Sequence, residues 1–401
     1  MPLKKTILFA HHDGNLAGST ISLGNILAYL NCNQFVPRVV LAQDGPARQY
    51  YQALGVDVDV VPANRFGSAP GPHPWKLSWL LNWRAFLANP RLSRYLSTVP
   101  WDLLHINDKA FISAGLAADR LQKPIVWHLR SSYFPTHSRL NALASRRVIR
   151  STADQVIAIS EDEIDGFEDF EPLEIIYNSV DFEKTSRAAA AREETRRDLG
   201  LQKTDLLIGQ VSTSIGEVRG TWDFLHACGR MNRTLKRPGL RFVIVAAIPE
   251  REKFRPNERH PLDQAWEIAR EEGIADQLTF TGFRQDALNL MAAMDVVVVC
   301  NRHGVLGRMP FEVMACGRSL VATAGHSGKS RVAVHRETAL IVPPMDPDAI
   351  AAAVCELIQD PDLRRHLEAQ GPVYARENFD PEKNARRIEQ VYRKLLTGKQ
   401  S

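Results

Sequence analysis

Short apolar runs recur along the whole chain, and longer amphipathic stretches separate many of them. Typical runs are KTILFA at residues 5–10, PIVWHL at residues 124–129 and DVVVVC at residues 295–300. Because such runs are rich in β-branched residues and do not alternate with polar ones, they suit strands buried on both faces of parallel sheets. Strands that alternate with helices over the full length predict an α/β fold.

A polar, alanine-rich stretch from Asn178 to Gly200 divides the chain into two halves. We interpret it as a linker followed by a helix, and a new apolar strand begins at Leu206. A length of 401 residues also suits two domains. The pattern predicts two doubly wound Rossmann-like domains, residues 1–180 and 181–380, that face across a cleft. Ligands of such sheets bind beyond the carboxyl ends of the strands, so chemistry is expected in the loops there.

The composition, with 44% hydrophobic and 24% charged residues, is that of an ordinary globular protein. A net charge of +4 argues against a general nucleic-acid binder. The five cysteines lack C-x-x-C spacing, so we expect reduced thiols in a cytoplasmic protein and no metal site. The first apolar run is too short for a signal peptide, and no stretch is long enough to span a membrane. Any membrane contact is therefore expected to be peripheral, at the inner face.

The loop after the first strand, HHDGNLAGST, contains Gly14 and Gly18, which let a ligand approach the backbone. Ser19 or Thr20 is expected to cap the next helix, whose N-terminus favours an anion. The spacing differs from G-x-G-x-x-G, so a dinucleotide fingerprint is not supported. The alternative is an ordinary turn between a strand and a helix.

His128 and Arg130 lie at the end of another apolar run and just beyond it. A histidine at the carboxyl end of a strand can act as a general acid or base, or can hydrogen-bond a hydroxyl. His105 holds a similar but weaker position in LLHIND. The alternative for each histidine is a structural role with its hydrogen bonds satisfied in the core.

Arg219 and Gly220 stand in a polar loop just before a predicted helix. An arginine there can bind two phosphate oxygens, with help from the helix dipole. The alternative is a solvated surface arginine.

The strongest signal lies in CNRHGVLGRMPFEVMACGRSLVAT, residues 300–323. Gly304 and Gly307 allow its loop to approach a ligand, and the following proline suits the first turn of a helix. Free backbone N–H groups near Arg308 and Met309 are expected to point at an anion.

Glu312, in the first turn of that helix, can accept hydrogen bonds from vicinal hydroxyls such as those of a ribose. The alternative is a favourable charge against the helix dipole, worth about 0.3–1 kcal/mol. A further glycine loop downstream, GHSGKSRVAV, offers Lys329 and Arg331.

A stripe of tryptophans recurs every four residues at Trp75, Trp79 and Trp83, with basic residues nearby. On a helix these rings form one face. The favoured interpretation is a face turned to the core. The alternative is an acceptor-binding or lipid-facing surface, to which Arg130 could also belong, because tryptophan with basic residues suits an interfacial helix.

Taken in order, these motifs make the chain resemble the GT-B retaining glycosyltransferases of family 4. The resemblance covers nearly the whole length and rests on the N-terminal glycine loop, VIAISE, IYNSVDFEK, the arginine–glycine loop, LTFTGF, GRMPFEVMACGRSLVAT and ALIVPPMDPDAIAAAV. These motifs are together specific for the family, not for a substrate. The resemblance implies an acceptor-side domain at residues 1–180 and a donor-binding domain at 181–380. It also implies that a last helix, about 381–401, packs back on the first domain.

The resemblance also implies roles for single residues. Glu312 matches a glutamate that binds the donor ribose, and Arg219 matches a lysine that holds the diphosphate. His128 matches a histidine beside the donor sugar, and Gly18 belongs to the loop that closes over the phosphates. No metal or cofactor is implied, because the nucleotide-sugar is a co-substrate. The remaining residues of the expected donor site are Thr213, Gly304, Gly307, Arg308, Met309 and Lys329.

Three positions depart from the family pattern. Thr213 stands near the place of an arginine, Gly304 at that of a glutamate, and Arg331 near that of another glutamate. We hypothesise that Arg308, Lys329 or Arg331 restores the missing cation. An arginine that reaches the pyrophosphate contributes about 1.5–3 kcal/mol as a charged hydrogen bond.

The expected function is a retaining, metal-independent transferase that moves a sugar from a UDP- or GDP-type donor. The acceptor would be a glycan, a lipid-linked molecule or a small molecule, in surface polysaccharide or glycoconjugate synthesis. The departures at Gly304 and Thr213 motivate an alternative, a catalytically silent GT-B protein that binds sugar or a partner transferase. A nucleotide-sugar epimerase is a third and less favoured interpretation.

Overall fold

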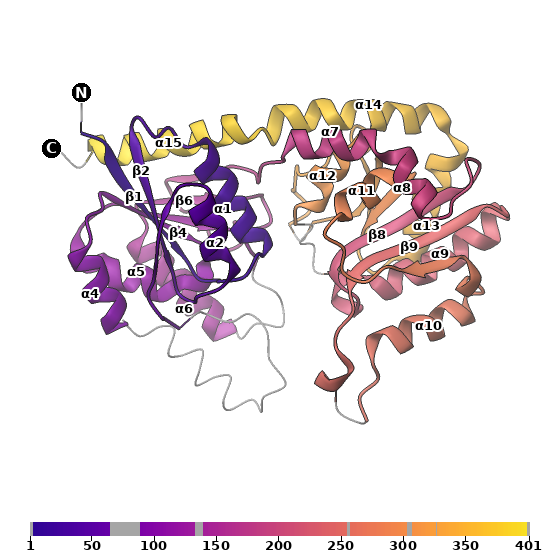
Figure 1. The fold of residues 1–401 in the computed structure, drawn as a ribbon, viewed down its shortest axis with the longest axis horizontal. Helices are drawn as coiled ribbons and strands as arrows, with labels where there is room; N and C mark the ends of the chain where they lie inside the picture. Colours follow the sequence, from indigo (N-terminus) through magenta and orange to yellow (C-terminus); the bar gives the residue numbers. More distant parts are fainter. Residues whose placement is uncertain are drawn as a thin grey trace. The chain divides into compact units, whose positions relative to one another are not determined.

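A computed structural model describes residues 3–64, 89–132, 139–254, 257–302, 307–325 and 327–398. The chain divides into two compact units. Unit 1 comprises Met1–Ser179 together with Pro381–Ser401, and unit 2 comprises Val180–Asp380. The last helix therefore belongs to the same unit as the first strand (Figure 1).

Unit 1 is built on a seven-stranded sheet in the order β3-β2-β1-β4-β5-β6-β7, and every neighbouring pair is parallel. The apolar run at the N-terminus forms a strand, as predicted. The strands are β1 (Lys5–His11), β2 (Phe35–Leu41), β3 (Asp57–Val60), β4 (Leu103–Asn107), β5 (Ile125–Leu129), β6 (Gln155–Ala158) and β7 (Leu173–Ile175).

Helices cover both faces of this sheet, which explains why its strands are apolar without alternation (Figure 1). On one face α4 (Pro90–Thr98), α5 (Ile112–Ala118) and α6 (Arg139–Thr152) pack on one apolar cluster. On the other face α1 (Gly18–Tyr29), α2 (Pro46–Ala53) and α15 (Pro381–Gly398) pack on a second cluster.

Unit 2 has a six-stranded parallel sheet in the order β10-β9-β8-β11-β12-β13. Its strands are β8 (Leu206–Ser214), β9 (Leu240–Ala247), β10 (Leu278–Phe280), β11 (Val296–Val299), β12 (Ser319–Thr323) and β13 (Leu340–Val342). Its helices are α7 (Phe182–Ala190), α8 (Arg192–Asp198), α9 (Thr221–Leu235), α10 (Pro261–Glu271), α11 (Ala287–Ala293), α12 (Met309–Ala315), α13 (Pro347–Gln359) and α14 (Pro361–Asn378).

The stretch between the halves differs from the prediction of a linker followed by one helix. It forms two helices in immediate succession, α7 and α8. Asp181 caps the first by accepting a hydrogen bond from the backbone N–H of Lys184. Arg192 and Arg196 hold the second by pairing with Asp295, at 2.6 and 3.1 Å. These charges are internal contacts of unit 2, which a charge-rich sequence alone does not reveal.

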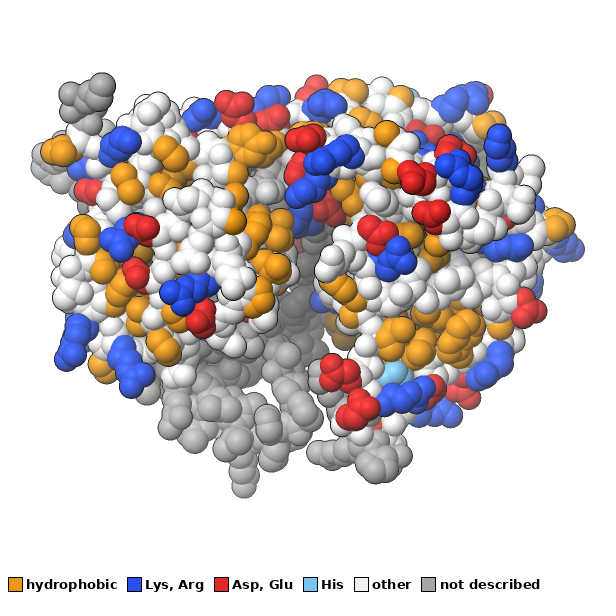
Figure 2. All heavy atoms as spheres, in the orientation of Figure 1, with side chains coloured by type: hydrophobic (Ala, Val, Ile, Leu, Met, Phe, Trp, Pro, Cys, Tyr) orange, Lys and Arg blue, Asp and Glu red, His pale blue; other side chains and the backbone are white. Residues whose placement is uncertain are grey.

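Each sheet has one position where the strand order reverses. In unit 1 it lies between β1 and β4, and in unit 2 between β8 and β11. Loops diverge from the carboxyl ends of the two strands there and leave space for a ligand. The sheets confirm the predicted α/β class with two doubly wound, Rossmann-like halves. Figure 2 shows basic and acidic side chains interspersed on the face that it presents, in keeping with the small net charge.

Candidate active site

A buried polar network occupies the reversal point of unit 1. Asn107, at the end of β4, places its Nδ2 2.9 Å from Nδ1 of His11, at the end of β1. Nε2 of His11 lies 3.0 Å from Oγ1 of Thr20. The side chains of His11, Asn107 and Thr20 are fully buried. Burial and the charge of Arg130 are among the causes that lower the pKa of His11 well below its ordinary value. This histidine is therefore neutral at pH 7.

The glycine loop after β1 packs tightly at one end and is open at the other. A Cβ on Gly14 would lie 2.6 Å from the carbonyl oxygen of Asp44, so only glycine fits between the two backbones. A Cβ on Gly18 would meet nothing within 4 Å. Neither Ser19 nor Thr20 caps α1 as expected. Instead, the hydroxyl of Thr20 donates to the carbonyl oxygen of Asn15 at 2.6 Å.

His128, at the end of β5, belongs to the same network. Its Nδ1 lies 3.2 Å from Nε2 of His105, whose Nδ1 lies 2.7 Å from the hydroxyl of Tyr392 in α15. Burial, and then the nearby charge of Arg130, lowers the pKa of His105 and of His128 well below the ordinary value. Nε2 of His128 is buried and has no hydrogen-bond partner among the described residues.

Arg130 lies inside this network, with 9% of its surface exposed. Its guanidinium donates to Asn107 and, at 2.7 Å, to Oδ1 of Asn178. Its predicted place on an acceptor-binding or membrane face stays a prediction. The three tryptophans of the predicted stripe, Trp75, Trp79 and Trp83, fall outside the described residues, and their role stays a prediction.

A second buried cluster follows β4, and sequence reasoning missed it. Lys109 donates to the carbonyl oxygen and Oγ of Ser131 and to the carbonyl oxygen of Ser132. Glu163 accepts from Ser160 at 2.5 Å and from Ser132 at 3.2 Å. Burial lowers the pKa of Lys109 to about 8 and raises that of Glu163 to about 7. In the sequence, the only indication of this cluster was Lys109, which closely follows a buried strand.

Arg219 lies at the reversal point of unit 2, in the short turn before α9. Its guanidinium is half-buried and has no ion-pair partner among the described residues, and burial lowers its pKa. The next residue, Gly220, has φ 67°, and a Cβ there would lie 3.0 Å from the carbonyl oxygen of Cys300. Glycine is thus required both by the left-handed backbone and by the close approach of the end of β11.

Arg302, which the sequence analysis did not select, joins the two loops of this reversal point. Its Nε and NH2 each lie 2.9 Å from a carboxylate oxygen of Asp223, and its NH1 contacts Glu217. Its backbone N–H also donates to the carbonyl oxygen of Val218. Since these contacts flank Arg219, they fix the loop that presents this cation.

Glu312 lies in the first turn of α12 and pairs with Arg308, whose NH2 is 2.7 Å from Oε1. Nε of Arg308 is buried without a partner among the described residues. Gly307, with φ 64°, permits the turn that leads into α12. Met309 begins the helix. Gly304, the position that departs from the family pattern, lies outside the described residues.

A third loop of unit 2 is tied to the same edge of the sheet. Oγ1 of Thr323, at the end of β12, accepts from the backbone N–H of Asn301 at 3.0 Å. Lys329 is exposed in the glycine loop that follows. Thr213 is exposed at the end of β8. The structure therefore brings the loops after β8, β11 and β12 together at one edge of the sheet.

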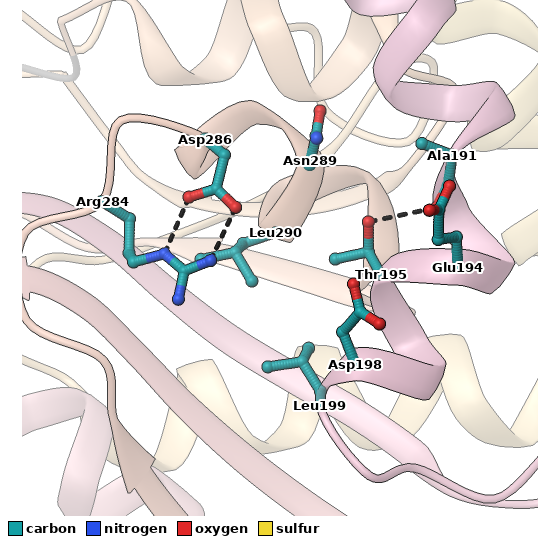
Figure 3. A pocket seen from close by; sticks show the side chains of 9 residues that line it. All are labelled: Ala191, Glu194, Thr195, Asp198, Leu199, Arg284, Asp286, Asn289 and Leu290. Atoms are coloured by element: carbon teal, nitrogen blue, oxygen red, sulfur yellow. Dashed lines mark hydrogen bonds and ion pairs between the residues drawn. The ribbon is translucent and has the colours of Figure 1, made fainter.

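A separate pocket of about 260 Å³ lies elsewhere in unit 2, between α8 and the start of α11 (Figure 3). Arg284 on its wall pairs with Asp286 at 2.6 and 2.7 Å. Glu194 and Asp198 from α8 also line it. None of the predicted site residues lines this pocket, so we do not assign the donor to it.

Each half of the chain matches the model of a known protein family. Residues 203–360 match the family model described as Glycosyl transferases group 1. Residues 47–184 match the model described as Glycosyltransferase Family 4.

Two characterised relatives and one solved structure illustrate the similarity. The chain is 30% identical over 290 residues to a 2-deoxystreptamine N-acetyl-D-glucosaminyltransferase of Streptomyces fradiae. The aligned residues make up 71% of this chain and 62% of the relative. It is 34% identical over 122 residues to the lipopolysaccharide core biosynthesis glycosyltransferase LpsD of Rhizobium meliloti, covering 30% of this chain and 34% of the relative. The crystal structure of Anabaena HepE in complex with UDP superposes with a TM-score of 0.77 and 21% identity, over 96% of this chain and 99% of that chain.

The chain contains two doubly wound parallel sheets and superposes on HepE along nearly its whole length. These observations place its fold in the GT-B class. The chain belongs, within that class, to the glycosyltransferases of the family 4 type. The expectation drawn from the motifs is thereby confirmed for the family and for the fold.

Proposed function

We propose that the protein is a retaining, metal-independent glycosyltransferase that uses a nucleotide diphosphate sugar of the UDP or GDP type. The observation that carries this proposal is the half-buried guanidinium of Arg219, which has no ion-pair partner among the described residues. A cation held without a counterion at the reversal point of a parallel sheet is suited to bind a diphosphate.

In this proposal residues 181–380 bind the donor. Arg219 pairs with the diphosphate, and Glu312 accepts hydrogen bonds from the ribose through the carboxylate oxygen that Arg308 leaves free. HepE, which shares the fold, has been solved with UDP and with UDP-glucose, which supports a donor of this kind. The exposed Lys329, with Gly18 and Gly307, completes the proposed donor set.

The chemistry that we propose for these residues is electrostatic. When the sugar–phosphate bond breaks, negative charge develops on the leaving diphosphate. A fixed cation such as Arg219 stabilises that charge without needing to reorganise. His128 is proposed to donate a hydrogen bond to a hydroxyl of the transferred sugar. Retention at the anomeric carbon is inferred from the family and is part of the proposal.

The acceptor is proposed to be a glycan, a lipid-linked molecule or a small molecule in glycoconjugate synthesis. The relatives support this range, since one is named for 2-deoxystreptamine and another for the lipopolysaccharide core. No helix among the described residues is long and apolar enough to cross a bilayer. A peripheral membrane contact through the tryptophan stripe at residues 75–83 stays a prediction.

Release of nucleotide diphosphate from a panel of UDP-, GDP- and dTDP-sugars tests the proposal. Release or acceptor-dependent transfer from one donor, lost in Arg219→Ala, is the expected result. Arg251→Ala is the matched control, because Arg251 is an exposed arginine of unit 2 that pairs with Asp263. Nucleotide binding should be measured in the same samples. A folded protein that neither binds nor turns over any donor would favour the alternative, a catalytically silent GT-B protein.

A further inference from the structure

Arg130 fixes the direction of the hydrogen bonds around it, because a guanidinium donates and cannot accept. Its Nε donates to Oδ1 of Asn107, and its NH1 donates to Oδ1 of Asn178 at 2.7 Å. Its NH2 lies 3.3 Å from Nδ1 of His128, which must therefore be the acceptor.

The first chain of hydrogen bonds leads from Arg130 to the glycine loop. Because Oδ1 of Asn107 is turned to Arg130, its Nδ2 is the atom that donates to Nδ1 of His11. The proton of neutral His11 must then sit on Nε2, from which it can be donated to Oγ1 of Thr20. The hydroxyl of Thr20 donates onward to the carbonyl oxygen of Asn15.

The second chain leads from Arg130 to the C-terminal helix. Since Nδ1 of His128 accepts, Nε2 of His105 at 3.2 Å must carry the proton that it shares with His128. Nδ1 of His105 is then an acceptor, and the hydroxyl of Tyr392 donates to it at 2.7 Å. The opposite direction would place an N–H of His128 against the N–H of Arg130, which is repulsive.

The second chain leaves the proton of His128 on Nε2. This nitrogen is buried and has no partner among the described residues. A buried donor without a partner is rare in proteins and calls for a water or a ligand atom to accept from it. His128 and Arg130 also line a cavity about the size of one water molecule, together with Ser22 and Asn384.

We propose that Arg130 is a positioning residue that locks His128 in the tautomer with its proton on Nε2. His128 then offers a hydrogen-bond donor to an oxygen acceptor, such as a sugar hydroxyl, and does not act as a base. This inference deepens the proposed function and rests on it for the nature of the acceptor. The tautomer itself is a property of the free protein.

Nitrogen-15 NMR of the histidine side chains tests the proposal on the full chain without any donor. In ¹⁵N-histidine-labelled protein at pH 7.5, long-range ¹H–¹⁵N correlations distinguish the two tautomers and the imidazolium. Assignment uses His11→Gln, His105→Gln and His128→Gln. The expected result is that all three rings are neutral and protonated on Nε2. A wild-type His128 that is protonated on Nδ1, or charged, would overturn the proposal.

Two variants then separate the role of Arg130 from a general structural role. Arg130→Met removes the guanidinium N–H that donates to His128. The hydrogen-bond chain through His105 can then run in either direction. The Nδ1–H form of His128 should therefore rise to a population comparable with that of the Nε2–H form. Tyr392→Phe removes the other end of the chain but leaves Arg130 in place, so His128 should keep its tautomer while the protein loses stability. An unchanged His128 in a folded Arg130→Met variant, or an equal shift in Tyr392→Phe, would refute the assignment to Arg130. Absence of nucleotide release with the expected tautomers would count against the proposed function alone.

Discussion

Arg302 and Asp223 form a two-point ion pair in which Nε and NH2 of the arginine each lie 2.9 Å from a carboxylate oxygen. The two residues are 79 positions apart: Arg302 follows β11, and Asp223 lies in the first turn of α9. Asp223 is buried, with 4% of its surface exposed, whereas Arg302 is about one-quarter exposed. The pair therefore holds the turn that carries Arg219 against the end of β11.

Loss of this pair should destabilise unit 2. Arg302→Ala leaves a buried carboxylate without its partner, so we expect a loss of about 2–3 kcal/mol in the free energy of unfolding. Urea unfolding measures it. Arg251→Ala breaks an ion pair that is exposed on both sides, and should cost no more than about 1 kcal/mol. Equal losses in the two variants would mean that Arg302 is an ordinary surface arginine.

Removal of the Arg219 guanidinium should weaken nucleotide binding and leave stability almost unchanged. A charged hydrogen bond of about 1.5–3 kcal/mol corresponds to a roughly 10- to 100-fold weaker Kd for the nucleoside diphosphate. Isothermal titration calorimetry measures the Kd, and thermal unfolding measures the stability. Arg219→Lys should recover part of the affinity, because it keeps the charge but not the two-point geometry. Full affinity in Arg219→Ala would contradict the role of this residue.

Glu312 should distinguish a ribose from a deoxyribose. If its carboxylate accepts from the ribose hydroxyls, the wild type should bind the ribonucleotide roughly 10-fold more tightly than its 2′-deoxy analogue. Glu312→Ala should lower the affinity for the ribonucleotide until the two ligands bind alike. Competition titrations of the two nucleotides give this ratio directly. A preference for ribose that survives in Glu312→Ala would show that another group recognises the hydroxyls.

The buried carboxyl of Glu163 should make unit 1 less stable as the pH rises. Burial raises the pKa of Glu163 from its ordinary 4.5 to about 7, so the folded protein holds this proton more tightly than the unfolded chain does. The stabilisation is complete below about pH 4.5 and is lost as the pH rises through about 7. It amounts to about 1.4 kcal/mol for each unit of pKa.

A comparison of Glu163→Gln with the wild type isolates this effect. The variant should gain stability relative to the wild type as the pH rises from about 4.5 to about 7. Thermal unfolding across this window measures the difference. Glu193→Gln, at an exposed position, should show no such trend. A pH-independent difference for Glu163→Gln would mean that the pKa of this carboxyl is not raised in the folded protein.

The alternative interpretation of the tryptophan stripe, a lipid contact, can be tested separately. Replacement of Trp79 and Trp83 with Ala should abolish co-sedimentation with anionic vesicles if these rings face a membrane. A loss of stability with no change in lipid binding would show that the rings face a core.

The apolar pattern of the chain was sufficient to predict the parallel sheets and the division into two halves. Local sequence also indicated the loops of Arg219 and Glu312, because a glycine or a proline marks where a strand ends and a helix begins. The partners of these residues could not be predicted. That Arg302 meets Asp223, or that Tyr392 meets His105, depends on strand order and on which helices cover each sheet. Residue types and spacing do not encode these contacts between distant positions.

The position of Tyr392 has a consequence for biosynthesis. The hydroxyl that completes the histidine chain of unit 1 comes after all of unit 2 in the sequence, whereas the histidine that it contacts is encoded 287 residues earlier. A ribosome therefore presents all of unit 2 before unit 1 can close around its buried polar groups. A chain that stops between the end of unit 2 and Tyr392 should have an open first unit and a complete second one.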